Sequence, residues 1–218
     1  MSFLSLFFDV AGRNVFILGT GEVATRRANR FLDKGANVVL VGNHIDSVLV
    51  DKGAILKSVD DVDSLVDWSD IVVLASGDRE LCDYVSSISG DKLLNRADVP
   101  FEGNLIVPTS FFIGDVEVSL YTHGKSPLMA RELRKKIQET ITENDIHEIE
   151  LQDYCRKILK SELSNQKDRK EILYTISNNN KIKDYINNNE IEKAKQYAKT
   201  IINKKTKEIK ENWYLILV

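Results

Sequence analysis

The sequence contains few cysteines and no excess of charge of either sign. Among its 218 residues are two cysteines, Cys82 and Cys155, and the formal net charge is -3. Two cysteines so far apart exclude a disulfide framework and a Cys-x-x-Cys zinc site, and they indicate a reducing compartment. A small net charge gives no indication of nucleic acid or of an acidic membrane surface as a partner, and we predict neither.

Long hydrophobic runs are also missing. No apolar run approaches the roughly 18 to 20 residues that a membrane-spanning helix needs. The apolar opening over residues 1–8 lacks a basic region and a cleavage site of small residues, and Asp9 ends it, so it does not resemble a signal peptide. We expect this segment to be buried, with its phenylalanines packed beneath the first strand. The protein is therefore predicted to be soluble and cytoplasmic.

The histidines do not have the spacing of a metal site. His44, His123 and His147 are far apart, and His147-Glu148 is not part of a His-Glu-x-x-His motif. We therefore predict no metal ligand, and we interpret His123 as an ordinary surface or core histidine.

The first hundred residues alternate short β-rich runs with helical patterns. Residues 37–41 (NVVLV) form a near-continuous apolar run, as expected for a parallel strand that is covered on both faces. Strands are expected at residues 14–18, 37–41, around 55–56, at 71–75 and around 93–94, and helices at 22–34 and 79–88. This alternation implies right-handed βαβ crossovers, and the predicted fold class is α/β, a Rossmann-type doubly wound parallel sheet.

The pattern changes after the first hundred residues. Two β-rich runs at residues 104–112 and 116–121 flank Gly114-Asp115, which favours a turn. A helix is then expected from Ser126-Pro127 to about Thr142, because Ser126 can cap it and proline suits its first turn.

The sequence from about residue 143 is helical in pattern and very polar. Asparagine runs at residues 178–180 and 187–189 are expected to be loops between helices, and lysines interleaved with glutamates are typical of a solvated helical face. We therefore divide the chain into a Rossmann domain at residues 1–112, a small α+β region at 113–142 and a helical domain at 143–218.

A glycine-rich motif lies between the first expected strand and the first expected helix. Residues 19–24 (GTGEVA) match G-x-G-x-x-A, in which Gly19 makes the tight turn and Gly21 lets the backbone approach a diphosphate. The helix N-terminus then offers unpaired N–H groups and a partial positive charge. The residues predicted to bind a dinucleotide are Gly19, Thr20, Gly21, Glu22 and Val23. The alternative is a structural glycine turn that binds nothing.

The end of the second expected strand is the usual place for an acidic residue that binds the adenosine ribose. Here the chain reads Val41-Gly42-Asn43-His44, with no carboxylate before Asp46. Asn43 is predicted to bond to the ribose hydroxyls. No arginine is present there to hold a 2′-phosphate, so NAD is favoured mildly over NADP.

Five short segments resemble one known family in their order and spacing. They are LFFD and GR within residues 6–13, the glycine loop running on into Arg26, VLAS followed by Asp78, NRAD at residues 95–98, and GKSP at residues 124–127 followed by Ala130-Arg131 and Leu133-Arg134. The family is that of the precorrin-2 dehydrogenases, which includes the N-terminal part of bacterial siroheme synthase and its bifunctional fungal counterpart. The resemblance covers about residues 1–140.

This resemblance implies a Rossmann domain, a dimerisation region after it and a helical C-terminal region, and therefore a homodimer. It implies NAD as hydride acceptor and precorrin-2 as the substrate, which is oxidised to sirohydrochlorin. Asp98, which ends the NRAD segment, is implied to serve catalysis, and Ser126 to lie near the tetrapyrrole. Ser76, in the VLAS segment, is assigned to the cofactor site.

The chemistry of the reaction fits a carboxylate at Asp98. Loss of a hydride must be accompanied by loss of a proton to a base or to solvent. Asp98 follows the fifth expected strand, and a carboxylate there is expected to act as general base, most effectively if burial raises its pKa. The alternative is a turn aspartate that bonds to nearby backbone N–H groups.

The substrate carries eight carboxylates, so its site should hold several cations. Lys125 and Arg131 belong to the matched segment and are predicted to bind the substrate together with Ser126. Lys135 and Lys136 fit an exposed basic helix surface equally well.

Some features depart from the family pattern. Val99 stands where many relatives have a second aspartate, and the Asn/Lys-rich end has no match. Two other functions stay open: a bifunctional dehydrogenase and ferrochelatase, and a non-catalytic NAD(H)-binding sensor whose helical tail contacts a protein partner.

Overall fold

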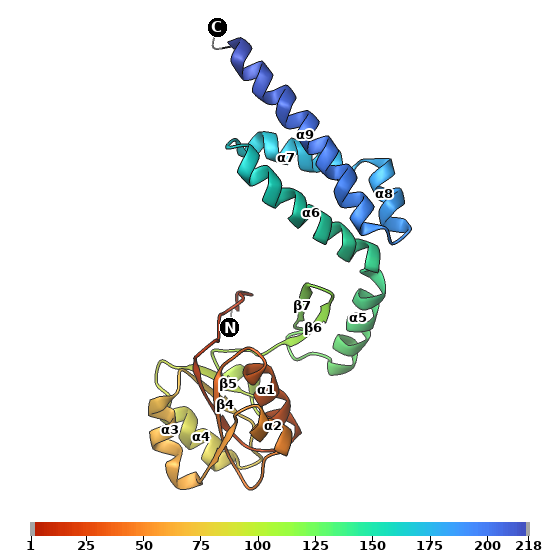
Figure 1. Cartoon of the computed structure of the whole chain (residues 1–218). Helices are drawn as coiled ribbons and strands as arrows, with labels where there is room; N and C mark the ends of the chain where they lie inside the picture. The colour runs from red at the N-terminus through yellow and green to blue at the C-terminus, as the bar shows by residue number, and fades with distance from the viewer. Residues whose placement is uncertain (1–2, 217–218) are drawn as a thin grey trace. The chain divides into compact units, whose positions relative to one another are not determined.

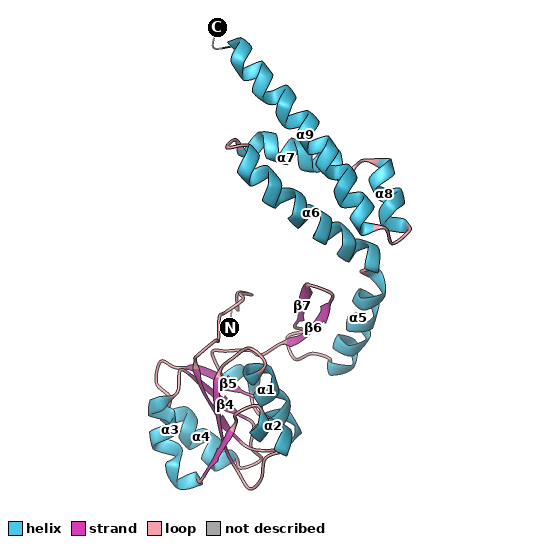
Figure 2. Cartoon of the chain, in the orientation of Figure 1, coloured by secondary structure: helices cyan, strands magenta, loops and turns pink. Residues whose placement is uncertain are grey.

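The computed structural model describes residues 3–216, with side chains up to residue 211, and the chain divides into two units. The first unit, Met1–Pro108, holds a parallel sheet between helices. The second unit, Thr109–Val218, holds a hairpin and a series of helices (Figure 1; Figure 2). Met1 and Ser2, which begin the apolar opening, lie outside the described residues.

Five parallel strands form the sheet of the first unit, in the order β3-β2-β1-β4-β5. The strands are β1 (Asn14–Leu18), β2 (Asn37–Val41), β3 (Ile55–Lys57), β4 (Ile71–Leu74) and β5 (Leu93–Arg96). The chain leaves β1 towards β2 and later continues with β4 on the other side of β1. The carboxyl ends of β1 and β4 therefore mark the switch point at which doubly wound folds bind ligands, and the expected fold class is confirmed.

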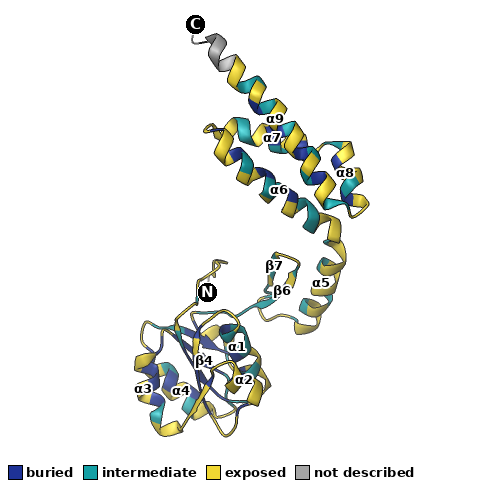
Figure 3. Ribbon diagram, viewed as in Figure 1, coloured by how far each residue is buried: buried dark blue, intermediate teal, exposed yellow. Residues whose placement is uncertain are grey.

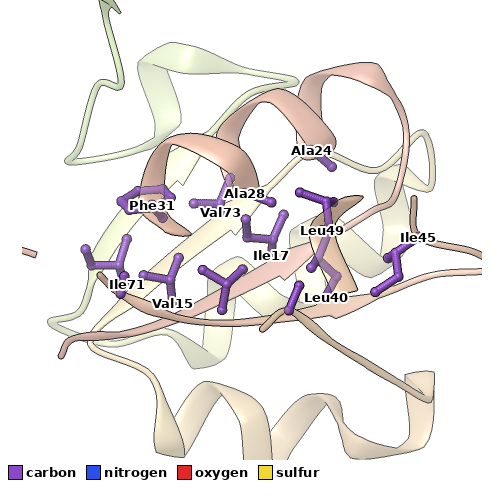
Figure 4. Close-up of a cluster of buried hydrophobic side chains, with 13 residues drawn as sticks. Val15, Ile17, Ala24, Ala28, Phe31, Leu40, Ile45, Leu49, Ile71 and Val73 are labelled. Carbon is purple, nitrogen blue, oxygen red and sulfur yellow. The ribbon is translucent and has the colours of Figure 1, made fainter. Parts of the chain in front are cut away.

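Helices cover both faces of this sheet (Figure 1). One face is covered by α1 (Glu22–Leu32) and α2 (Ser47–Asp51), and the other by α3 (Val62–Trp68) and α4 (Arg79–Ile88). Successive side chains of β1 alternate between the faces, so that Val15 and Ile17 pack under α1 while Phe16 and Leu18 pack on the other side. Figure 4 shows Ala24, Ala28 and Phe31 of α1 lying over the first group.

The apolar opening is exposed, so the expectation that its phenylalanines pack beneath the first strand is wrong. Every residue from 3 to 9 is exposed (Figure 3), and Phe7 is 79% exposed. Both faces of β1 are already covered by helices, which leaves no apolar surface for this segment to fill. Val10, which follows it, does pack against the core on the α1 side.

The segment between β5 and the hairpin also differs from expectation. The sequence predicts one strand over residues 104–112, but the strand begins at Thr109. A short 3-10 helix, η2 (Pro100–Glu102), is followed by a segment that runs along β5, where the N–H of Leu105 donates to the carbonyl of Leu94 at 2.9 Å. This part of the chain therefore closes the edge of the first unit. A second 3-10 turn, η1 (Val59–Asp61), precedes α3.

The second unit begins with an antiparallel hairpin of β6 (Thr109–Ile113) and β7 (Val116–Leu120). Five helices follow it: α5 (Pro127–Thr140), α6 (Glu143–Glu162), α7 (Gln166–Ser177), α8 (Asn180–Asn187) and α9 (Ile191–Ile216). The last four share one apolar core, in which Leu159, Ile176 and Ile202 are fully buried. No helix among residues 3–216 is long and apolar enough to cross a membrane.

The asparagine runs are loops between helices only in part, because Asn180 begins α8 and Asn187 ends it. Asn178 and Asn179 separate α7 from α8, and the side chain of Asn179 caps α8 by accepting a hydrogen bond from the N–H of Ile182 at 3.2 Å. Asn189 has a φ of 58°, a left-handed conformation that asparagine tolerates well, and it turns the chain into α9. The further division of the second unit into a dimerisation region and a helical domain stays a prediction.

Candidate active site

The loop between β1 and α1 requires glycine at its first position. Gly19 has a φ of 114°, and a Cβ atom there would lie 3.0 Å from the amide nitrogen of Ser76 and closer still to the carbonyl of Ala75. The N–H of Gly19 donates to the carbonyl of Val41 at 2.8 Å. The loop is therefore fixed between the ends of β2 and β4, and a side chain at Gly19 would disrupt it.

The second glycine of the motif has a different role. Gly21 has a φ of -73°, which any residue adopts, and a Cβ atom there would have no atom within 4 Å. The fold itself therefore does not need glycine here, and the missing side chain leaves open space in front of the loop. This is the arrangement that the close approach of a diphosphate to the backbone requires.

The N-terminus of α1 has no side-chain cap. Asp46 and Asp78 cap α2 and α4 with their carboxylates, whereas Gly21 at the start of α1 offers no capping group. The first-turn N–H groups of α1 can therefore donate to a bound anion, which the helix dipole also favours. The residues present thus fit the diphosphate of a dinucleotide. Glu22 and Val23 in this first turn are exposed.

A third glycine, Gly42, lies at the same edge of the sheet. Sequence reasoning did not identify it as a residue of the site. A Cβ atom there would lie 2.6 Å from the Cγ2 atom of Thr20, so the end of β2 and the glycine loop are in close contact. Asn43 follows and is exposed beside this contact. Asp46 is engaged in capping α2, where it accepts a hydrogen bond from the N–H of Val48 at 2.9 Å.

Ser76 follows β4 and lies next to the glycine loop. Its hydroxyl accepts a hydrogen bond from the N–H of Asp78 at 3.1 Å, which shapes the turn into α4. The structure therefore brings the glycine loop, Asn43 and Ser76 together at one edge of the sheet. Their role in cofactor binding stays a prediction.

Asp98 lies just beyond β5, where it forms a bidentate ion pair with Arg96. The Nε and Nη2 atoms of Arg96 donate to the two carboxylate oxygens of Asp98 at 3.1 and 2.5 Å. The Arg96 side chain is 2% exposed and that of Asp98 is 20% exposed. The backbone N–H groups of Val99 and of Asp98 itself act in the same direction as Arg96, because they favour the ionised carboxylate.

The ionisation of Asp98 differs from the expectation that burial raises its pKa. Partial burial acts in that direction, but the hydrogen bonds and charge of Arg96 and the backbone N–H groups outweigh it. The pKa of Asp98 is therefore held below its usual value. A carboxylate with a lowered pKa is a weaker base, and Asp98 remains ionised at neutral pH.

Asn95, the first residue of the NRAD segment, has a structural role. Asn95 is buried, and its side-chain amide donates to the carbonyl of Leu105 at 2.8 Å. The side chain of Asn104 accepts a hydrogen bond from the N–H of Leu94 and donates one to the carbonyl of Lys92. These contacts attach residues 104–105 to β5 and fix the loop that carries Asp98.

The residues assigned to the substrate belong to the second unit. Ser126 caps α5 by accepting a hydrogen bond from the N–H of Met129 at 3.1 Å, as expected. Lys125 and Arg131 are exposed beside this helix start. Lys135 pairs with Glu132 at 3.0 Å, which favours the alternative of an exposed helix surface for this residue.

Two arginines of the first unit were missed by sequence reasoning. Arg96 ends the strand-like run LLNR, and its charge inside a strand was the available signal. Arg27 lies on α1 between Arg26 and Arg30, and among the described residues its Nη1 atom is buried without a hydrogen-bond partner. Burial, followed by the charges of these two neighbours, lowers the pKa of Arg27 to about 10.

Comparisons with known proteins agree with this arrangement. Residues 6–109 match a family model described as putative NAD(P)-binding. A precorrin-2 dehydrogenase of Methanosarcina barkeri is 28% identical over 187 residues, which cover 80% of this chain and 83% of the relative. A precorrin-2 dehydrogenase of Priestia megaterium is 28% identical over 178 residues, covering 78% of this chain and 87% of the relative.

A solved structure supports the fold. The structure titled SirC, precorrin-2 dehydrogenase, aligns with a TM-score of 0.73 and 23% identity, covering 91% of this chain and 100% of the other. At this level of identity the likeness concerns the fold, and it extends over elements of both units.

Proposed function

We propose that the chain is a member of the precorrin-2 dehydrogenase family and that it oxidises precorrin-2 to sirohydrochlorin with NAD as the hydride acceptor. The observation that carries the proposal is the length of the similarity. The alignment of 187 residues with the Methanosarcina barkeri enzyme is longer than the first unit, Met1–Pro108, so the similarity is not that of a dinucleotide-binding domain alone.

The first unit supplies the cofactor site. When bound, NAD accepts the hydride that the substrate loses. The backbone around Gly19 and Gly21 and the uncapped start of α1 bind the diphosphate, and the open space at Gly21 admits it. Asn43 bonds to the ribose hydroxyls, and the preference is for NAD because no arginine follows β2 to bind a 2′-phosphate.

Two cationic side chains of the second unit bind the substrate. Lys125 and Arg131 are exposed near the start of α5, where they are accessible to the carboxylates of the macrocycle. Ser126 holds this helix start in place through its capping bond. Asp98 contributes a carboxylate at the edge of the sheet that carries the cofactor loop.

The assay follows oxidation of precorrin-2 by absorbance under anaerobic conditions, with NAD or NADP as acceptor. We expect the wild type to form sirohydrochlorin faster with NAD, and Asp98→Ala to be slowed by at least tenfold. Asp91→Ala, which removes an exposed aspartate elsewhere in the first unit, serves as the matched control and should retain full activity. Absence of oxidation by the wild type contradicts the function, whereas an unaffected Asp98→Ala contradicts only the role of Asp98.

We also propose that the chain forms a homodimer through the hairpin and α5. No residue of α5 is buried, and its apolar side chains include Leu128, which is 65% exposed, as well as Met129 and Leu133. Such a surface favours association. Sedimentation equilibrium should give twice the chain mass for the wild type and a lower mass for Leu128→Glu, and a monomeric wild type would contradict the proposal.

The reaction is assigned to the cytoplasm. Both cysteines, Cys82 and Cys155, are buried free thiols, as is usual in a reducing compartment. Fractionation of the producing cells should recover the activity with the cytoplasmic proteins, and recovery from an external or periplasmic fraction would contradict this assignment.

A further inference from the structure

Arg96 stands among three carboxylates that come from three different segments. Asp83 on α4 lies 2.8 Å from its Nη1 atom, Glu102 in η2 lies 2.9 Å from the same atom, and Asp98 occupies the Nε and Nη2 side. The guanidinium is almost completely buried, whereas the side chains of Asp83 and Glu102 are about half exposed. The arginine therefore joins α4, β5 and η2 at one point.

The geometry of the Arg96–Asp98 pair restricts what Asp98 can do. Both of its oxygens accept from the same planar guanidinium, an arrangement that fixes the direction of the carboxylate as well as its position. Taking up a proton would require Asp98 to give up part of this bidentate pair. A carboxylate held in this way is suited to act through its charge.

The group of charged side chains around Asp98 has a net negative charge. Asp83 and Glu102 also carry negative charge, and Arg79 on α4 adds a second guanidinium 3.9 Å from Asp83. Three carboxylates thus face two arginines. The buried thiol of Cys82 also lies near Asp98, and its pKa is raised first by burial and then by the charge of Asp98, with a smaller effect in the same direction from Asp78 at the start of α4.

Oxidation of the substrate creates the charge that such a cluster would stabilise. A C–H bond of the macrocycle breaks, its electron pair leaves as hydride to NAD, and the macrocycle carries a positive charge until a proton departs. Building on the function proposed above, we infer that Arg96 is a positioning residue that holds Asp98 as a fixed anion, which stabilises this positive charge while the proton passes to water. In this scheme Asp98 is not the proton acceptor.

The test compares Arg96→Lys with the wild type by activity and by titration. Lysine keeps the charge but cannot form the bidentate pair. We expect kcat to fall about tenfold to a hundredfold, because small displacements of catalytic groups have effects of this size. The Kd for NAD, measured by calorimetry, should stay unchanged. Arg13→Lys is the matched control, since Arg13 forms an exposed pair with Asp70 at 3.6 Å in the same unit, and it should retain wild-type activity.

A titration of the Asp98 carboxyl by NMR supplies a readout that is independent of turnover. The signal is assigned by its loss in Asp98→Asn. We expect the pKa of Asp98 to rise in Arg96→Lys relative to the wild type, and to fall in Glu102→Gln, where a competing carboxylate of Arg96 is neutralised. An Asp98 that titrates at the same pH in all three proteins contradicts the role of Arg96. Glu102→Gln retains Arg96 and therefore keeps the test informative if Arg96→Lys does not fold.

The pH dependence of turnover separates the fixed anion from a general base. A fixed anion predicts that Asp98→Asn loses activity by the same factor at every pH between about 5 and 9. Recovery of this variant as the pH rises would show that Asp98 takes up the proton and would overturn the inference. If the wild type does not oxidise precorrin-2 at all, the proposed function fails, while the titration still decides whether Arg96 fixes Asp98.

Discussion

Two loops at the same edge of the sheet differ in whether their polar groups already have hydrogen-bond partners within the chain. The glycine loop after β1 leaves its helix N-terminus uncapped and leaves open space at Gly21. In the loop after β5, both carboxylate oxygens of Asp98 accept hydrogen bonds from the guanidinium of Arg96. The two loops therefore suit different roles. The unpaired N–H groups of the glycine loop can bind a ligand. The carboxylate of Asp98, which the chain already holds, can supply a negative charge at a fixed position.

The largest expected effect is that of Gly19→Ala. The Cβ atom would meet the backbone of Ala75 and Ser76, and the φ of 114° is strained for alanine. We expect the free energy of unfolding to fall by about 3 kcal/mol or more, with loss of NAD binding. Urea denaturation and calorimetry measure the two effects. A fully stable Gly19→Ala would show that the loop adapts and that its glycine is not required by the fold.

A smaller and more selective effect is expected of Gly21→Ala. Its φ suits alanine and the added methyl group meets no atom of the chain, so stability should change by less than about 0.5 kcal/mol. The methyl group enters the space assigned to the diphosphate, and we expect the Kd for NAD to rise at least tenfold. The same two measurements apply. Unchanged NAD affinity would mean that the diphosphate does not lie in front of this loop.

The next effect concerns the substrate rather than the cofactor. Lys125→Ala and Arg131→Ala each remove one exposed cation at the start of α5. We expect the KM for precorrin-2 to rise about threefold to tenfold, as for the loss of one charge-assisted contact that solvent partly screens, with the Kd for NAD unchanged. Lys135→Ala, which removes a lysine already paired with Glu132, is the control and should leave KM unaffected.

The smallest expected effect is the contribution of Asp98 to stability as the pH changes. Its pKa is lower in the folded chain than in the unfolded chain, so the unfolded chain binds more protons near the unfolded-state value of about 4. The stabilisation is therefore present above about pH 4 and is lost as the pH falls through the folded-state pKa. Urea denaturation between pH 2 and pH 7 should show this loss in the wild type and a weaker loss in Asp98→Asn. Parallel curves for the two proteins would contradict it.

The sheet was predictable because its strands are covered on both faces. Such strands form continuous apolar runs, and β1 and β2 have the expected bounds, as does α4. The predictions are wrong where contacts between residues distant in the sequence determine the structure. The apolar opening remains exposed because helices already cover β1, and residues 104–105 run beside β5 because of hydrogen bonds of the Asn95 and Asn104 side chains.

The candidate site was predictable in part. The glycine loop was found from its motif and its position between strand and helix, and Asp98 was found from the resemblance of NRAD to a family segment. Arg96 was missed because its partners Asp83 and Glu102 lie on other elements, and no local spacing brings the three together. Gly42 was not recognised because its contact with Thr20 exists only once β1 and β2 are paired.

The most direct test of the account is the stoichiometry of the reaction in the absence of oxygen. Wild-type protein, precorrin-2 and NAD are mixed, and NADH and sirohydrochlorin are measured together by absorbance. The account predicts one NADH for each sirohydrochlorin, with Gly21→Ala showing the same stoichiometry at a higher NAD concentration. Sirohydrochlorin formed without NADH, or NAD bound without any change in the macrocycle, would contradict it.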